Sequence, residues 1–400
     1  MNMDFQYTAE ERDLRNEAID FVLRNWPDNG KDANSLIVAS YDVDDADEQD
    51  RVHDFIRKLV KQGWWTMHWP REYGGQAAPL GTQLAYREAM AYAGAPEILG
   101  GGMVAPMIMM HGQQWQKEKF LPEIANGDIF HWSQGFSEPN AGSDLANVQT
   151  RAVEDGDDFV LNGQKIWNSE GRWADWGHYL VRTDPDQPKH RGVSYMFVDM
   201  KQPGITVRPL YDGLGRWRWS EIFLEDVRVP KRNLIGELNR GFYTAMTTLS
   251  FERSQVEIPA RLMLFMEQFV EAAKARRRRG GHDLLADPIA RNAIADLRVQ
   301  IETTRMLCYR VAWMQSQGLV PDKEASMVKL MGDEVGFTVY NRLAKLMEDD
   351  AMMLPRTSKR APLSGFMGVN AWLIRGLAIG GGTDEVQRNI IAQRGLDLPR

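Results

Sequence analysis

The sequence contains very little cysteine, since Cys308 is the single one among 400 residues. A disulfide framework and a cysteine-based metal site each need more than one cysteine, so both are excluded, and no metal centre is predicted. The sequence also lacks an excess of positive charge, because its formal net charge is −7. Nucleic acids and anionic membrane surfaces attract basic proteins, so we expect neither of them as the main partner.

We expect neither a signal peptide nor a membrane span. The N-terminal segment carries Asp4, Glu10 and Glu11 where a signal peptide has basic and then apolar residues. The longest apolar run, residues 103–110, is interrupted by Pro106 and is far shorter than the roughly 20 residues that cross a bilayer. We therefore expect a soluble protein of a reducing compartment, with the cytoplasm as its location.

The length predicts two or three domains, and 43% hydrophobic residues are enough for a large core. The first third has the apolar spacing of helices. Thr8 and Glu11 have the spacing of a capping box, which predicts a helix over 8–25. The other predictions for this third are a loop over 28–47 and helices over 48–62, 81–94 and 103–127.

The hydrophobic period changes to two near residue 130. Short alternating stretches, separated by turn pairs such as Asp155-Gly156 and Asn162-Gly163, predict consecutive strands joined by tight turns. About eight such strands predict a small antiparallel barrel or a sandwich. Because no long helix separates the strands, a doubly wound parallel sheet is not expected.

After Pro230 the helical period returns. Helices are predicted over 241–278, 288–317 and 323–350, and Asp287-Pro288 marks the start of the second. Antiparallel helices of this length form a bundle. The predicted architecture is α+β and mostly α, with an N-terminal helical domain over 1–129, an antiparallel β-barrel domain over 130–234 and a C-terminal four-helix bundle over 235–400.

The stretch Phe136-Ser-Glu-Pro-Asn-Ala-Gly-Ser-Asp144 stands at the first domain boundary. Its small and turn-forming residues leave backbone N–H groups and hydroxyls free to point at a ligand. By itself such a cluster is either a surface turn or part of a ligand site.

Five further stretches follow it along the chain: Asn162-Gly-Gln-Lys-Ile-Trp-Asn-Ser-Glu-Gly171, Arg191-Gly192, Glu225-Asp-Val-Arg-Val-Pro230, Glu252-Arg253 and Gly380-Gly-Gly-Thr-Asp-Glu-Val-Gln-Arg-Asn389. Together the six resemble the acyl-CoA dehydrogenase family over essentially the whole chain. The resemblance implies a helical domain, a middle β-domain and a C-terminal four-helix bundle, with FAD between them.

The resemblance also implies which residues contact the flavin. Phe136 and Ser137 resemble the pair that meets the edge of the flavin ring. Trp167 resembles part of the second wall of the flavin pocket, and the alternative for it is an ordinary aromatic of the barrel core. The other implied cofactor contacts are Ser143, Asn168, Ser169, Thr383, Asp384 and Glu385. The implied substrate contacts are Ser143, Arg253, Gly381 and Gly382.

The resemblance implies a catalytic base on a helix. Dehydrogenation removes the Cα proton of a thioester, and a carboxylate in an apolar pocket can accept that proton. Many family members have this glutamate at the loop position of Gly381, and glycine cannot act as a base. A minority have a Glu-Arg pair on a bundle helix, which Glu252-Arg253 matches. Glu252 is therefore the predicted base, and the alternative for it is a surface glutamate paired with an arginine.

Two stretches depart from the family where it binds the adenine end of FAD. Arg277-Arg-Arg-Gly-Gly281 replaces Arg-x-x-Phe-Gly, and Met347-Glu-Asp-Asp-Ala-Met-Met353 replaces Gln-x-x-Gly-Gly-x-Gly. The run Arg276–Arg279 is either a solvated helix end or a phosphate contact. In some bacterial acyl-CoA dehydrogenases of steroid side-chain breakdown, two unlike subunits share the FAD sites. This chain resembles the subunit with the base, so a heterotetramer with a companion subunit is predicted beside a homo-oligomer.

Three functions stay open. The first is FAD-dependent oxidation of an acyl-CoA to the trans-2-enoyl-CoA, for which the resemblance implies electron-transfer flavoprotein or a similar acceptor as partner. The second is a flavin-dependent monooxygenase or oxidase on the same fold, and the third is a subunit without catalytic activity. Glu252 favours the first. The acyl group stays open among short-chain, branched, dicarboxylic and steroid-derived chains.

Overall fold

The computed structural model describes residues 6–26, 46–96, 101–129, 131–169, 171–213, 215–248, 254–274, 276, 281, 283–353 and 361–399. The chain divides into two compact units. The helical unit contains Met1–Asp42, Ala77–Glu97 and Glu252–Arg400, and the sheet unit contains Val43–Gln76 and Ile98–Phe251. Helices of the first 129 residues therefore belong to both units, and the domain boundaries near 129 and 235 stay predictions.

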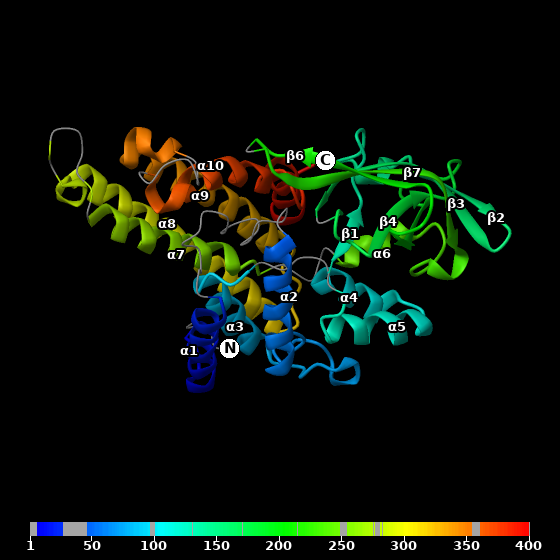
Figure 1. Cartoon of the computed structure of the whole chain (residues 1–400), viewed down its shortest axis with the longest axis horizontal. Helices are drawn as coiled ribbons and strands as arrows, with labels where there is room; N and C mark the ends of the chain where they lie inside the picture. The colour runs from blue at the N-terminus through cyan, green and yellow to red at the C-terminus, as the bar shows by residue number, and fades with distance from the viewer. Residues whose placement is uncertain are drawn as a thin grey trace. The chain divides into compact units, whose positions relative to one another are not determined.

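The helical unit has four long or medium helices around one apolar core. Phe265 and Phe269 of α7, Ile301 of α8 and Tyr340 of α9 are buried in this core together with Ile374 of α10. In Figure 1, α8 and α9 run side by side. The helices of this unit are α1 (Ala9–Asn25), α3 (Leu80–Tyr92), α7 (Glu257–Lys274), α8 (Pro288–Ser316), α9 (Asp322–Met347), α10 (Phe366–Leu377) and α11 (Asp384–Ile390).

Two predicted helix starts are confirmed. The Glu11 backbone N–H donates to Thr8 Oγ1 (3.2 Å), and the Thr8 backbone N–H donates to Glu11 Oε2 (2.8 Å), which completes the capping box of α1. At α8 the Ile289 backbone N–H donates to Asp287 Oδ1 (2.8 Å), and Pro288 takes the first helical position. The loop predicted over 28–47 lies almost entirely outside the described residues.

The single helix predicted over 241–278 is wrong. The chain forms α6 (Gly241–Thr248) and then α7, and Gln255 between them has a left-handed φ of 46°. Pro259 explains the late start of α7, because proline has no N–H and its ring clashes with the carbonyl four residues earlier in a continuous helix. In the first turn of α7 neither cost arises.

The sheet unit combines one seven-stranded sheet with four helices among its described residues. Its helices are α2 (Ala46–Lys61), α4 (Gly101–His111), α5 (Gln114–Ala125) and α6. Its strands are β1 (Trp132–Gly135), β2 (Arg151–Asp155), β3 (Asp158–Ser169), β4 (Trp176–Arg182), β5 (Val193–Asp199), β6 (Ile205–Tyr211) and β7 (Trp217–Pro230).

The sheet is open and mixed, so the predicted closed antiparallel barrel needs correction. The strand order is β1-β4-β2-β3-β7-β6, β5 pairs with β4, and the β1–β4 and β2–β4 pairings are parallel. The Ile235 backbone N–H donates to Tyr195 O (2.8 Å), and bridges join Leu234 and Arg240 to β5. Because this segment lies along β5, that strand does not close the sheet against β6.

A turn predicted at Asn162-Gly163 is also absent. β3 continues through both residues, and its pairing with β7 shifts by one residue there. The Asn162 side chain accepts from the Asp226 backbone N–H (3.0 Å) and donates to Asp226 Oδ1 (3.0 Å), which bridges the irregularity. A Cβ on Gly163 would lie 2.7 Å from the Thr150 Cα, so the glycine permits close packing rather than a turn.

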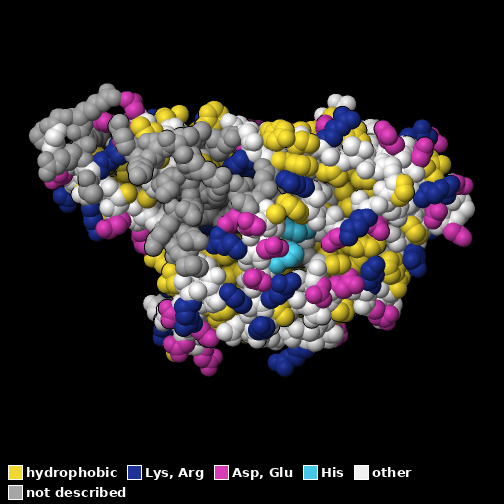
Figure 2. Space-filling model, viewed as in Figure 1, with side chains coloured by type: hydrophobic (Ala, Val, Ile, Leu, Met, Phe, Trp, Pro, Cys, Tyr) yellow, Lys and Arg dark blue, Asp and Glu magenta, His cyan; other side chains and the backbone are white. Residues whose placement is uncertain are grey.

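Charged side chains of both signs are mixed at the surface. Figure 2 shows Lys and Arg side chains interspersed with Asp and Glu side chains on the face that it draws. Over the described part of the chain, the helices include none with the length and apolarity to cross a membrane.

A buried carboxylate connects three segments of the helical unit. Glu88 of α3 accepts hydrogen bonds from the Tyr7 hydroxyl (2.6 Å) and the Tyr309 hydroxyl (2.7 Å), and it pairs with Arg305 of α8. Burial alone would raise the pKa of Glu88, but the hydrogen bond and charge of Arg305 and the two hydroxyls lower it below its usual value. The carboxylate therefore holds α3, α8 and the N-terminal segment together.

We expect Glu88→Gln to cost about 2–4 kcal/mol of unfolding free energy, because it leaves Arg305 without its buried counterion. Glu267→Gln is the matched control, since Glu267 accepts from Tyr92 (2.7 Å) at an exposed position, and its cost should stay below about 1 kcal/mol. Denaturant unfolding followed by circular dichroism measures both. Equal costs would contradict the role given to Glu88.

Candidate functional site

The stretch 136–144 is a tight turn anchored at its base. The Phe136 ring is buried and packs edge-to-face on His178 and Tyr195, with centroid distances of 5.7 Å and 5.6 Å. Backbone groups of Glu138 and Ala141 exchange two hydrogen bonds of 3.0 Å. The turn's outer residues, Pro139 to Ser143 apart from Ala141, are exposed. The hydroxyl of Ser143 is thus available to a ligand, while the Phe136 side chain belongs to the core.

Beneath this turn lies a buried ion pair. Lys165 Nζ donates to Glu138 Oε1 (2.7 Å) and to Leu180 O (2.5 Å), and the Lys165 side chain is fully buried. Glu138 also accepts from the backbone N–H groups of Gln149 (2.6 Å) and Thr150 (2.9 Å). Burial opposes the charge of Glu138, but Lys165 and these hydrogen bonds lower the pKa of the carboxyl below its usual value. The carboxylate thus holds the turn against β3 and the residues before β2.

Trp167 is held in an unusual conformation. Its φ is 62°, in the left-handed region that a bulky residue rarely adopts, and its pairing with β7 is interrupted by a bulge. The side chain is 57% exposed and meets Trp219 edge-to-face at 5.8 Å. The alternative of a buried core aromatic is therefore wrong. Strained residues persist where the surroundings fix them, and they cluster at binding sites.

The neighbours of Trp167 explain how the bulge is fixed. Asn168 is fully buried, and its Nδ2 donates to Gln134 O (2.8 Å) and Ser133 Oγ (3.2 Å) of β1. The Ile166 backbone N–H donates to Ser137 O (3.0 Å). Ser169 is half-buried at the end of β3. Together these contacts hold the exposed indole beside the start of the 136–144 turn.

Two buried side-chain amide atoms near the turn lack a hydrogen-bond partner among the described residues. They are Gln134 Nε2 on β1 and Asn168 Oδ1 on β3. Buried polar groups are normally paired, so atoms of this kind indicate a missing ligand or water. The donor-rich turn, the exposed indole and these two atoms fit a planar cofactor with polar edges such as a flavin.

The helical unit holds the second group of predicted site residues. Gly381 and Gly382 have φ values of 70° and 95°, and Gln387 Nε2 donates to the Gly382 carbonyl (3.1 Å). Thr383 caps α11 by accepting from the Val386 backbone N–H (3.3 Å). Asp384 turns a buried Oδ1 inward, whereas Glu385 is exposed.

Two predicted site residues, Glu252 and Arg253, lie outside the described residues. The other candidates divide between the units, with positions 136–169 in the sheet unit and positions 381–385 in the helical unit. In the sheet unit the hydrogen bond from the Ile166 N–H to Ser137 O brings residues 167–169 beside the 136–144 turn, whereas positions 381–385 of the helical unit are consecutive in the chain.

Arg276, which directly precedes the first of the two departing stretches, contacts the second. Arg276 forms an ion pair with Asp350, and its Nη2 donates to Met347 O (3.2 Å). One arginine of the predicted run is thus engaged inside the helical unit. Arg277, Arg278 and Arg279 lie outside the described residues.

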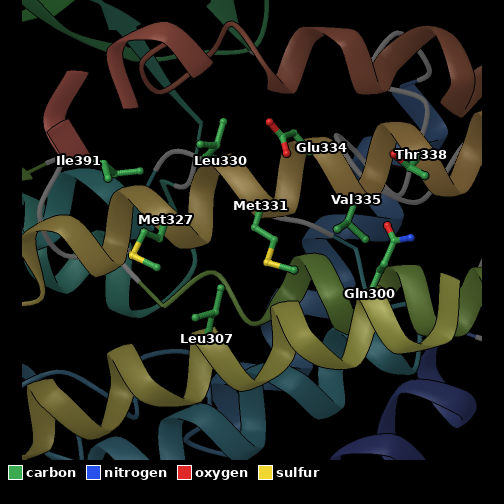
Figure 3. Close-up of a pocket in the computed structure, with 9 residues that line it drawn as sticks. All are labelled: Gln300, Leu307, Met327, Leu330, Met331, Glu334, Val335, Thr338 and Ile391. Carbon is green, nitrogen blue, oxygen red and sulfur yellow. The ribbon is translucent and has the colours of Figure 1, made fainter. Parts of the chain in front are cut away.

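A groove of about 390 Å³ lies between α8 and α9. Figure 3 shows Leu307 of α8 and Met331 of α9 directed toward one another across it. Its lining is mostly apolar and consists of Gln300, Leu307, Met327, Leu330, Met331, Glu334, Val335, Thr338 and Ile391.

Comparison with known sequences covers nearly the whole chain. The family models for the N-terminal, middle and C-terminal domains of acyl-CoA dehydrogenases match residues 8–128, 133–227 and 239–396. This chain belongs to the acyl-CoA dehydrogenase family. Among its relatives, acyl-CoA dehydrogenase FadE26 of Mycobacterium tuberculosis is 35% identical over 408 aligned positions, covering 100% of this chain and 99% of that protein.

Comparison with solved structures agrees with this assignment. The Tcur3481-Tcur3483 steroid ACAD matches with a TM-score of 0.88 and 29% identity, covering 100% of both chains. The ChsE4-ChsE5 complex from Mycobacterium tuberculosis matches with a TM-score of 0.84 and 33% identity, covering 99% of both chains. Homology to acyl-CoA dehydrogenases indicates an oxidoreductase that acts on a CH–CH group of an acyl-CoA.

The sequence reasoning missed the charged residues that support this acyl-CoA dehydrogenase site. Lys165 occupies an inward position of β3 that the strand period assigns to an apolar side chain. A lysine at such a position indicates a buried partner, and Glu138 inside the turn motif is that partner. The period of two was a usable signal, but it could not identify the counterion.

We expect Lys165→Met to cost about 3–5 kcal/mol of unfolding free energy, because Glu138 is then buried without a counterion. The double variant Lys165→Met/Glu138→Gln should recover most of that loss, since it removes both charges. Denaturant unfolding of the three proteins measures the coupling. Additive losses in the double variant would show that the two side chains are not coupled.

Proposed function

We propose that the protein is a FAD-dependent acyl-CoA dehydrogenase that oxidises an acyl-CoA thioester to the trans-2-enoyl-CoA, with Glu252 as the base. The conformation of the 380–383 loop carries this proposal. Gly381 has no carboxylate, and its φ of 70° is one that a glutamate adopts only with strain. The base must then come from elsewhere in the chain, and Glu252 is the matching residue of the Glu-Arg pair.

The turn in the sheet unit supports FAD as the cofactor. Bound FAD would supply the acceptor for the hydride that leaves Cβ of the substrate. We assign Phe136 through its backbone, together with Ser137 and Ser143, to the cofactor at the turn. Trp167 presents a flat apolar surface, and its exposure leaves that surface free for stacking. The remaining proposed contacts are Asn168, Ser169, Thr383, Asp384 and Glu385.

The residues of this chain would divide the reaction between them. Glu252 takes the proton from Cα, which requires a water-poor pocket that raises the pKa of its carboxyl. Gly381 and Gly382 have no side chains, so the thioester can approach their backbone closely. Ser143 and Arg253 are the other proposed substrate contacts.

We propose a steroid-derived acyl chain as the first substrate class to test. One solved structure similar to this chain is described as a steroid ACAD. Its 29% identity over the full length supports a related substrate, while branched and dicarboxylic acyl chains stay in the panel.

A companion subunit is the second part of this proposal. Arg276 forms an ion pair with Asp350 within the helical unit, so its charge is already neutralised and is a poor contact for FAD phosphates. The similar ChsE4-ChsE5 structure is a complex of two different proteins. The mostly apolar α8–α9 groove supports packing of another chain against this unit.

Anaerobic titration with a panel of acyl-CoAs tests the function. Loss of flavin absorbance upon addition of one acyl-CoA supports dehydrogenation. Turnover of a substrate that is not a thioester, dependent on oxygen and without anaerobic flavin bleaching, would support an oxidase or monooxygenase instead. Absence of bound flavin even with candidate companion subunits would support a non-catalytic subunit.

We expect Glu252→Gln to retain flavin while the rate of flavin bleaching by the acyl-CoA falls about 10²–10⁴-fold, because proton abstraction is lost. Glu257→Gln is the matched control, since Glu257 pairs with Arg87 at the start of α7 and has no proposed catalytic role. Stopped-flow absorbance under nitrogen measures the rates. A wild-type rate in Glu252→Gln would refute the assignment of the base.

Expression with and without a companion subunit tests the assembly. We expect the chain alone to bind less than one flavin per protomer, and flavin content to rise upon co-expression with a homologous subunit. Absorbance and analytical ultracentrifugation give flavin content and mass. A flavin-replete, active homo-oligomer would rule out an obligatory companion.

A further inference from the structure

Three charged side chains cluster next to the 380–383 loop, of which Lys329 and Asp333 are buried and Asp384 is half-buried. Asp333 of α9 is 3% exposed, and its carboxylate pairs with Lys329 one turn earlier on the same helix. Asp384, the first residue of α11, lies close enough to Asp333 for its side chain to raise the pKa of Asp333. Lys329 Cε lies 3.6 Å from the place that a Cβ on Gly381 would take. The cluster therefore touches the glycine that replaces the family's loop glutamate.

Two neighbouring carboxyl groups with buried oxygens are costly to ionise together. Lys329 satisfies one oxygen of Asp333, but Asp333 Oδ1 and Asp384 Oδ1 are buried and find no donor among the described residues. A buried carboxylate oxygen without a donor is unfavourable, and a proton on one of two neighbouring carboxyl groups would supply that donor. A metal ion is a poor alternative, because it would lie close to the Lys329 ammonium.

The other charged side chains described around Asp333 do not pair with its free oxygen, so they do not take the place of the proton. Glu334 of α9 and Arg388 of α11 pair with each other, and both side chains are about half exposed. On the side of α7, the apolar Ile258 lies next to Gly332. Among the described groups, Lys329 and Asp384 are those that act on Asp333.

We propose that Asp333 and Asp384 share one proton, and that this protonated pair positions the 380–383 loop on α9. The Asp384 backbone N–H donates to Ala378 O (3.2 Å), so Asp384 closes the loop with its backbone and anchors it with its side chain. Asp333 is a positioning residue, and Asp384, which is also a proposed FAD contact, positions the loop through its side chain. That this loop contacts flavin and thioester rests on the proposed function.

The proton is held near neutral pH. Burial raises the pKa of Asp333 to about 7, the positive charge of Lys329 opposes this rise, and Asp384 adds to it. In the unfolded chain the pKa of an aspartate is about 3.9, so the folded protein holds the proton in the range between these values. Stability then falls as pH rises from about 4 to about 7 and levels off above.

Asp384→Asn tests the pair, because its amide supplies the shared N–H at every pH. We expect the melting temperature of the variant minus that of wild type to rise by at least about 2 °C between pH 5.5 and pH 8.5. Glu334→Gln removes one carboxylate from the next residue of α9 and should show no such rise. A flat difference for Asp384→Asn would overturn the shared proton.

Infrared spectroscopy of the wild-type protein tests for the shared proton directly, so this test does not require the Asp384→Asn variant to fold. The pH-difference spectrum should contain the carbonyl band of a protonated carboxylic acid that disappears as pH rises through about 7. Absence of that band in wild type would overturn the shared proton.

Flavin affinity tests the positioning role. We expect the dissociation constant of FAD to increase several-fold from pH 5.5 to pH 8.5 in wild type and to stay constant in Asp384→Asn. A pH-independent constant in wild type would overturn the positioning of a flavin-binding loop. Failure of every acyl-CoA to bleach the flavin would refute the proposed function but leave the melting and infrared results unaffected.

Discussion

A charged pair in the core of the sheet unit fixes the geometry on which the candidate flavin site depends. Lys165 reaches Glu138 from the middle of β3, and Glu138 gathers the backbone donors of the residues that lead into β2. Burial of two charges adds little net stability, because desolvation consumes most of the attraction. The pair instead fixes the orientation of the Glu138 side chain, because each of its two carboxylate oxygens accepts at least one hydrogen bond. The turn above it, with the exposed Ser143, is therefore held in a fixed position on the sheet.

Local signals in the sequence were sufficient where the stabilising contact is local. The capping box of α1 and the Asp-Pro start of α8 join residues two or three positions apart, and both were predicted correctly. The break between α6 and α7 also had a local cause in Pro259, but the strong apolar period on both sides concealed it. By contrast, the open sheet depends on the segment that contains Leu234 and Arg240 lying along β5, which no local pattern specifies.

The sequence predicted the motif residues of the candidate site, but not the long-range contacts that hold them in place. The turn at 136–144 and Trp167 were found by their residue types, yet the left-handed φ and exposure of Trp167 follow from a bulge opposite β7. The pairing of Arg276 with Asp350 joins residues 74 positions apart, and the Asp333–Asp384 contact joins two separate helices. Such contacts depend on how helices pack, so composition and spacing contain almost no information about them.

An open sheet has an edge, and a free edge can pair with the edge of another molecule. β6 is the last strand on one side of the sheet, where it pairs with β7. Pro209 lies in the middle of this strand and has no N–H to donate, and Arg208 beside it adds a charge. Proline and charge on an edge strand both discourage edge-to-edge aggregation. Pro209 and Arg208 thus make the β6 edge a poor template for pairing with a strand of a second molecule.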